Sequence, residues 1–133
     1  MSITPVYAGL VALLFVFLSI RVIGARRAAR VGLGDGGNRL LLRRQRAHGN
    51  CAEYAPLAIV LMALAELQGT PPLLLHVIGI VLIAGRLVHA YGLSQEPEPS
   101  LARTLGMALT FAAIIIGALA NLGLGSIAAL LVA

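Results

Sequence analysis

The first part of the chain is a long apolar run, because no charged side chain occurs between Ile3 and Ile20. Three further apolar stretches follow, separated by segments rich in glycine or proline. A helix needs about 20 mostly apolar residues to cross the hydrocarbon core of a bilayer. Of the 133 residues, 59% are hydrophobic and only 11% are charged, which is too little charge for the surface of a water-soluble domain. We therefore expect an all-α integral membrane protein with four transmembrane helices in one bundle.

Glycine and proline mark the limits of these helices. Four glycines between Val31 and Asn38 predict a loop, and Gln68–Pro72 and Ser94–Pro99 are typical of a turn and a proline-broken acidic loop. The length of the chain indicates a single domain that covers residues 1–133. Within it, we expect helices at about residues 4–29, 39–67, 71–93 and 100–132.

The arginines indicate how the chain is oriented in the membrane. All ten basic residues are arginines that lie near the first loop, the third loop or the adjoining helix ends, whereas the middle turn and both chain ends have none. Because cytoplasmic loops are enriched in basic residues, the first and third loops are predicted to be cytoplasmic and both termini outside, in a bacterial inner membrane. A cleaved signal peptide would carry positive charge before its apolar run, so the first helix is interpreted as retained. Arginines scattered among apolar runs also argue against nucleic acid as a partner.

Polar residues fall within the second helix at membrane depth. Arg46, Asn50 and Glu53 are four and then three residues apart, which places them on one helix face, and Arg43 extends that face. The purely apolar part, residues 55–65, is too short to span a bilayer, so the polar turn must lie inside the membrane. Polar groups at that depth face protein or a watery cavity. We expect this face to bind a small anionic ligand shared with other helices.

Several other polar residues have structural interpretations. Thr4, directly before Pro5, is expected to cap the first helix, and Asn38 the second. Glu66 is expected to be solvated at the end of its helix. His76 and Asn121 are expected to form hydrogen bonds between helices. A lone cysteine, Cys51, and three scattered histidines lack the spacing of metal ligands, so we expect no metal site.

Two segments carry a family resemblance: Gly24–Val31, and Arg46–Pro56, in which an asparagine follows an arginine by four residues and precedes Glu-Tyr and a proline. With them the chain resembles the MAPEG superfamily, the membrane-associated proteins of eicosanoid and glutathione metabolism. Arg86, His89 and Arg103 also match, so the resemblance covers essentially the whole chain and is that of a bacterial-type member. It implies a four-helix subunit, a homotrimer, and glutathione bound between neighbouring subunits near the cytosolic side.

The resemblance also implies roles for individual residues. Arg103 would be the catalytic residue that stabilises the glutathione thiolate, and it would act electrostatically because an arginine does not give up its proton. The thiolate would attack a lipophilic electrophile that enters from the bilayer. The pattern departs at Leu93, where the eicosanoid enzymes carry a tyrosine. The residues expected to bind glutathione are Arg26, Arg46, His48, Asn50, Glu53, Tyr54, Arg86, His89 and Tyr91.

Three functions compete for this sequence. The first is a glutathione-dependent membrane transferase or peroxidase, which the presence of Arg103 favours. The second is a non-catalytic family member that binds a lipid or a protein, which Leu93 favours. The third is a small multidrug exporter, but that function needs an acidic residue deep within the first helix, and residues 3–20 have none. Arg46 and Glu53 could also form a structural ion pair within the bundle.

Overall fold

The computed structural model describes residues 2–95 and 100–132, and the side chains of residues 2–95 and 101–123. Four helices account for most of the chain: α1 (Thr4–Ala29), α2 (Arg39–Leu67), α3 (Pro72–Ser94) and α4 (Ser100–Val132). Each contains a stretch long and apolar enough to cross a membrane. The prediction of an all-α bundle of four membrane-length helices is confirmed, and every helix limit lies within one residue of the expected one.

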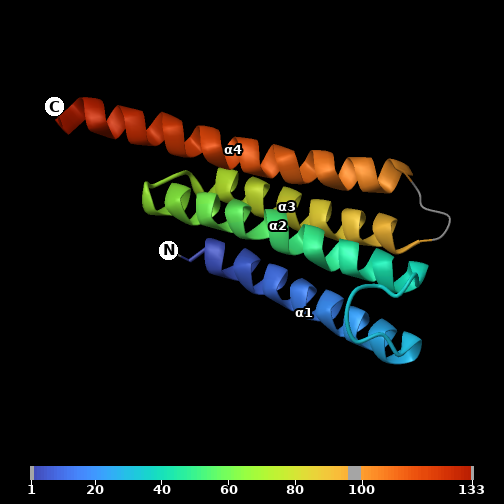
Figure 1. The fold of residues 1–133 in the computed structure, drawn as a ribbon. Helices are drawn as coiled ribbons and strands as arrows, with labels where there is room; N and C mark the ends of the chain where they lie inside the picture. The colour runs from blue at the N-terminus through green and yellow to red at the C-terminus, as the bar shows by residue number, and fades with distance from the viewer. Residues whose placement is uncertain (1, 96–99, 133) are drawn as a thin grey trace.

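The helices lie side by side, with α1 at one edge of the bundle, α4 at the opposite edge, and α2 and α3 between them (Figure 1). The α3–α4 pair makes the most extensive contact. The loop that joins α1 to α2, the end of α3 and the start of α4 lie at one end of the bundle, and the start of α1 and the end of α4 lie at the other. This arrangement gathers the arginine-rich helix ends at one end.

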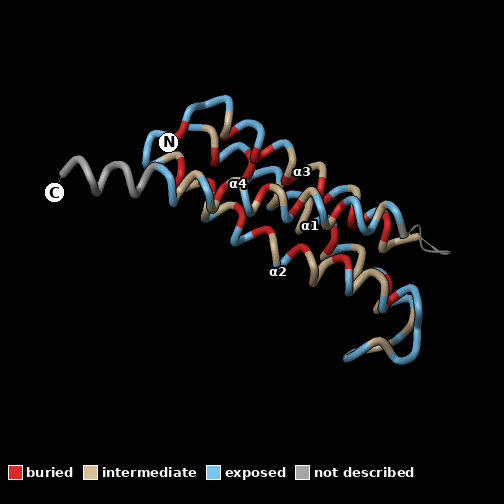
Figure 2. The backbone as a smooth tube through the Cα atoms, turned by 90° about the horizontal axis from the view of Figure 1, so that it is seen from above, coloured by how far each residue is buried: buried red, intermediate tan, exposed pale blue. Residues whose placement is uncertain are grey.

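Buried positions line the sides of the helices that face one another, and many large apolar side chains face outward, as expected for helices surrounded by lipid (Figure 2). The core has two clusters. The first, built on Met62, Ile78 and Leu82, lies toward the chain termini. The second, built on Leu18, Ala47 and Cys51, lies toward the arginine-rich end, so Cys51 is a small core residue.

A carboxylate from α2 holds the start of α1. The Glu66 side chain accepts hydrogen bonds from the backbone N–H groups of Ser2, Ile3 and Thr4, at 2.5, 2.9 and 2.7 Å. The first N–H groups of a helix have no partner within it, and they favour negative charge. Glu66 is still partly exposed, so it is solvated in part, but it also has a structural role that was not predicted. The cap of α1 also differs from the prediction, because no side chain next to the helix start serves as its cap.

Other polar residues join helices as predicted. The Tyr7 hydroxyl and His76 Nδ1 lie 2.9 Å apart, which joins α1 to α3. The Asn121 amide donates to the carbonyl of Leu61 at 2.8 Å, which joins α4 to α2. The Asn38 side chain accepts the backbone N–H of Leu41 at 2.9 Å and so caps α2. These bonds satisfy polar groups that would otherwise face apolar surroundings.

Glycine lets α3 and α4 approach closely beside the arginine-rich end. A Cβ placed on Gly106 of α4 would overlap the backbone of His89 on α3. A Cβ on Gly92 would lie 2.8 Å from the backbone nitrogen of Arg103. Small residues at such crossings are the usual means by which membrane helices pack backbone to backbone. Here the close crossing brings His89 and Arg103 to the same side of the bundle.

Candidate functional site

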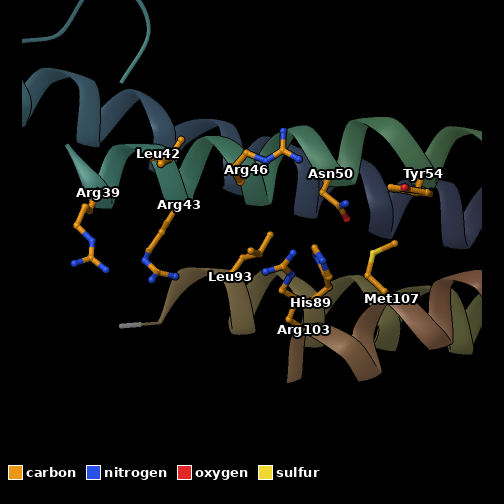
Figure 3. A pocket seen from close by; sticks show the side chains of 10 residues that line it. All are labelled: Arg39, Leu42, Arg43, Arg46, Asn50, Tyr54, His89, Leu93, Arg103 and Met107. Carbon is orange, nitrogen blue, oxygen red and sulfur yellow. The ribbon is translucent and has the colours of Figure 1, made fainter. Parts of the chain in front are cut away.

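A cleft of about 510 Å³ lies between α2 on one side and α3 and α4 on the other, at the arginine-rich end. Asn50 from α2 points toward the same space as His89 from α3 and Arg103 from α4 (Figure 3). Three helices distant in sequence therefore share one site. The cleft is lined by Arg39, Leu42, Arg43, Arg46, Asn50, Tyr54, His89, Leu93, Arg103 and Met107.

The α2 wall follows the helical repeat. After Arg39, its polar lining residues recur at intervals of four, three, four and four, through Arg43, Arg46, Asn50 and Tyr54. Residues three or four apart share a helix face, so one continuous stripe of α2 forms this wall. At its last turn the stripe continues to Tyr54, while Glu53 is exposed and does not line the cleft. The polar face inferred from the sequence is thus present, but its last member is Tyr54 rather than the neighbouring Glu53.

A buried arginine stands behind Asn50. Arg86 on α3 is only 2% exposed, and its Nη1 donates to Asn50 Oδ1 at 2.6 Å. Its Nε and Nη2 donate to Thr110 Oγ1 on α4, at 2.9 and 2.6 Å. This network occupies the carbonyl oxygen of the Asn50 amide, so the NH₂ group of that amide is the part left to meet a ligand in the cleft.

The cleft is strongly positive. Four arginines line it, and none of its lining residues is a carboxylate. Arg39, Arg46 and Arg103 are exposed, so the cleft is open at its surface. Near a protein surface, at an effective dielectric of about 20, a guanidinium and an anion about 4 Å apart still attract each other by about 4 kcal/mol. Arginine also presents paired N–H donors that match the two oxygens of a carboxylate. The cleft is therefore suited to an anion of small-molecule size.

The structure brings half of the ten predicted site residues together in this cleft. They are Arg46, Asn50, Tyr54, His89 and Arg103. The other half do not line it: Arg26, His48, Glu53, Arg86 and Tyr91. No bound ligand tests these assignments, so the roles of all ten stay predictions.

Two of the residues outside the cleft lie on the α1 side of the bundle. Arg26 Nη1 donates to the carbonyl of Gly34 at 2.8 Å and so holds the loop after α1. The His48 ring packs on Phe15 of α1, with ring centroids 4.5 Å apart. Neither residue lines the cleft.

Sequence reasoning missed four residues of the site or its support, one of which is the apolar Leu42. Arg39 was not among the predicted site residues, yet it precedes Arg46 by seven residues and shares its helix face. Thr110 and Met107 escaped notice within a long apolar run, although Thr110 follows Arg103 by seven residues. A search for polar residues at helical spacing from the predicted ones would have found Arg39 and Thr110.

An apolar hollow of about 320 Å³ lies on the other side of α2, between α2 and α1. Phe15, Ala52 and Pro56 are among the residues that line it, and Phe15 is the residue on which His48 packs. No group of three or more His, Cys, Asp or Glu residues suited to a metal ion occurs in the part of the chain that the structure describes.

Comparison with known proteins agrees with this architecture. The model of the MAPEG family matches residues 4–123, which include α1, α2, α3 and α4 as far as Gly123. The chain is also 42% identical, over 120 residues and 90% of each chain, to the inner membrane protein YecN of Escherichia coli, in each of two strains. The match to the family spans the cleft and both of its walls. The chain therefore belongs to the MAPEG family of membrane proteins.

Proposed function

We propose that this protein is a glutathione-dependent transferase or peroxidase of the inner membrane, which activates the glutathione thiol for attack on a lipophilic electrophile. The observation that carries the proposal is the cleft lined by four arginines and no carboxylate. Glutathione has two carboxylates, one ammonium group and one thiol, so most of its charge is complementary to this lining. The MAPEG family includes glutathione transferases, which supports the same ligand.

The cleft offers separate partners to the parts of glutathione. Arg43 and Arg46 on the α2 wall are placed to receive carboxylates through paired N–H donors. The Asn50 NH₂ group, oriented by Arg86, supplies a further donor. Glu53, exposed beside the stripe, is the carboxylate nearest in sequence to these residues and would accept from the ligand ammonium.

The residues outside the cleft support a site shared between subunits. Arg26 and His48 lie on the α1 side, opposite the cleft wall of α2. In a homotrimer, this side of one subunit would face the cleft of the next and would complete the glutathione site. The apolar hollow beside His48 would then adjoin that site and receive the lipophilic substrate from the bilayer.

The chemical step requires the thiolate, because a thiol is a poor nucleophile. Each unit by which the site lowers the pKa of the glutathione thiol takes about 1.4 kcal/mol of preferential stabilisation of the thiolate. At an effective dielectric of about 20, a guanidinium about 4 Å from the thiolate contributes about 4 kcal/mol, which is enough for one or two such units. Arg103, which meets the cleft from the first turn of α4, is the arginine assigned to this role.

The proposal is tested by glutathione binding to purified protein, with thiolate formation followed by ultraviolet absorbance. We expect wild type to bind glutathione and form thiolate near neutral pH. Arg103→Ala should keep the binding and lose the thiolate signal. Arg27→Ala, which removes an exposed arginine of α1, is the matched control and should change neither. Thiolate formation that survives in Arg103→Ala would remove this residue from its role, and absence of binding in wild type would refute the proposal.

The alternative is a non-catalytic family member that binds a lipid or a protein. Leu93 favours it, since this apolar side chain lines the cleft where the eicosanoid enzymes carry a tyrosine. The relative YecN is named only for its location. The same experiment separates the two functions, because a non-catalytic protein would form no thiolate in the wild type.

A further inference from the structure

An apolar groove of about 370 Å³ runs between α1 and α3, away from both the cleft and the hollow described above. It is lined by Leu10, Leu13, Leu14, Phe17, Ile83 and Leu87. The four lining residues of α1 lie at spacings of three, one and three, so they form a single stripe along the helix. A stripe of this kind is parallel to the helix axis and therefore runs roughly along the direction of lipid acyl chains.

Polar groups close the groove at the arginine-rich end. Arg21 follows Phe17 by one turn, and its guanidinium lies 5.8 Å from the centroid of that ring. Arg21 Nη1 also donates to Ser94 Oγ on α3 at 3.0 Å, so it bridges the two helices that form the groove. Tyr91, which lies on α3 between Leu87 and Ser94, is 61% exposed at the same end.

A second guanidinium lies at this position. Arg44 on α2 donates through Nη1 to the backbone carbonyl of Arg21 at 3.0 Å. Its Nε is buried and has no hydrogen-bond partner among the described residues. Among the residues that the structure describes, no carboxylate forms a salt bridge with Arg21 or Arg44. Two neighbouring cations repel each other, so an anion from outside the chain would be attracted to this position.

The depth of Arg21 in the membrane fits a phospholipid headgroup. From Thr4 to Arg21, α1 rises by about 26 Å at the usual rise per residue, which is close to the thickness of about 30 Å of the hydrocarbon core. Arg21 therefore lies near one polar boundary of the membrane while the apolar groove lies within it. Tyrosine is a preferred residue at that boundary, because its ring is apolar and its hydroxyl is polar.

We propose that this groove binds one anionic phospholipid of the leaflet on the arginine-rich side. One acyl chain lies along the stripe from Phe17 to Leu10, and the phosphate is held by Arg21 and Arg44. The Tyr91 hydroxyl is placed to bond the headgroup. None of these residues lines the glutathione cleft, and Tyr91 is the one among them that the family resemblance also assigns to glutathione.

The test is native mass spectrometry of the purified protein, released from detergent containing equal amounts of phosphatidylglycerol and phosphatidylethanolamine. We expect wild type to retain phosphatidylglycerol in preference. Arg21→Ala should lower its occupancy about fivefold, the effect of one basic residue near an anionic lipid surface. Leu87→Trp, which fills the groove and leaves the charge unchanged, should lower it to a similar extent. Arg27→Ala is the control, because it removes an exposed arginine of the same helix that is off this stripe.

Two results would overturn the proposal. The first is equal retention of the two lipids by wild type, or an equal loss in Arg27→Ala, since lipid would then be held only by the general positive charge. The second is a change in oligomer size in Leu87→Trp while Arg21→Ala keeps its lipid. That result would mean that a second copy of the chain covers the groove.

Discussion

Arg86 shows how a charged side chain is accommodated within this bundle. It is almost fully buried, and its donors meet Asn50, Thr110 and Met107 Sδ rather than a carboxylate of the described residues. Burying a charge is costly unless hydrogen bonds replace the lost hydration. Arg86 therefore depends on neutral acceptors from two other helices, and it couples the α2 wall of the cleft to α4.

We predict that Thr110→Val destabilises the protein by about 1–3 kcal/mol, the usual cost of a buried polar group that loses its acceptor. Valine has nearly the shape of threonine but cannot accept from Arg86 Nε and Nη2. Thermal unfolding in detergent measures the effect. Thr104→Val makes the same chemical change at an exposed position of α4 and should leave the transition unchanged. Equal transitions in the two variants would show that the network contributes no stability.

For single residues, the sequence predicted which helix face a side chain lies on better than it predicted whether that side chain lines the cleft. The spacing of Arg46 and Asn50 placed both on one stripe, and both line the cleft. Arg86 was expected in the same cleft, yet it lies behind Asn50. Helical periodicity gives the direction of a side chain, but the distance to the next helix determines whether that side chain lines a cavity or supports one. That distance depends on small residues such as Gly106, which belong to another part of the chain.

The α3–α4 pair determines the geometry of the cleft at the level of helices. The crossing places the Cα of Gly106 against the His89 backbone and leaves no room for a side chain. His89 and Arg103 both line the cleft, so a wider crossing would separate two of its lining residues. Helix limits, in contrast, follow from local sequence, because apolar runs end at glycine and proline wherever the helices pack.

Gly106→Ala should therefore lower the stability of the bundle by about 1–3 kcal/mol, a typical cost of overpacking. It should also weaken glutathione binding, because the helices that carry His89 and Arg103 must move apart. Gly123→Ala is the matched control on the same helix, where an added Cβ meets nothing within 4 Å. Thermal unfolding and glutathione titration of both variants measure the two effects. A Gly106→Ala protein as stable as the control would contradict the role of this close crossing.

At the scale of the whole molecule, the distribution of charge determines orientation. The net charge of +5 comes from arginines at the end of the bundle that holds the cleft. From the positive-inside rule we predict that this end faces the cytoplasm. The homotrimer, in contrast, cannot be predicted from the charge or the hydrophobic periodicity of the chain. Only the family resemblance suggests it.

Orientation is tested by labelling single cysteines in intact cells, with Cys51→Ala as background. Leu33 in the first loop is 91% exposed, and Leu67 at the end of α2 is 70% exposed, so both positions tolerate cysteine. A membrane-impermeant maleimide should label Leu67→Cys and spare Leu33→Cys until the cells are permeabilised. The reverse pattern would invert the assigned topology and place the cleft outside the cell.

The bond between Glu66 and the start of α1 has a consequence for how substitutions act in this protein. The carboxylate accepts from the backbone of Ser2, Ile3 and Thr4, and backbone N–H groups are the same in every residue but proline. Exchange of those three side chains therefore leaves the attachment intact, whereas one change at position 66 removes it. The tolerance of the first turn of α1 to mutation is thus governed by a residue more than sixty positions away.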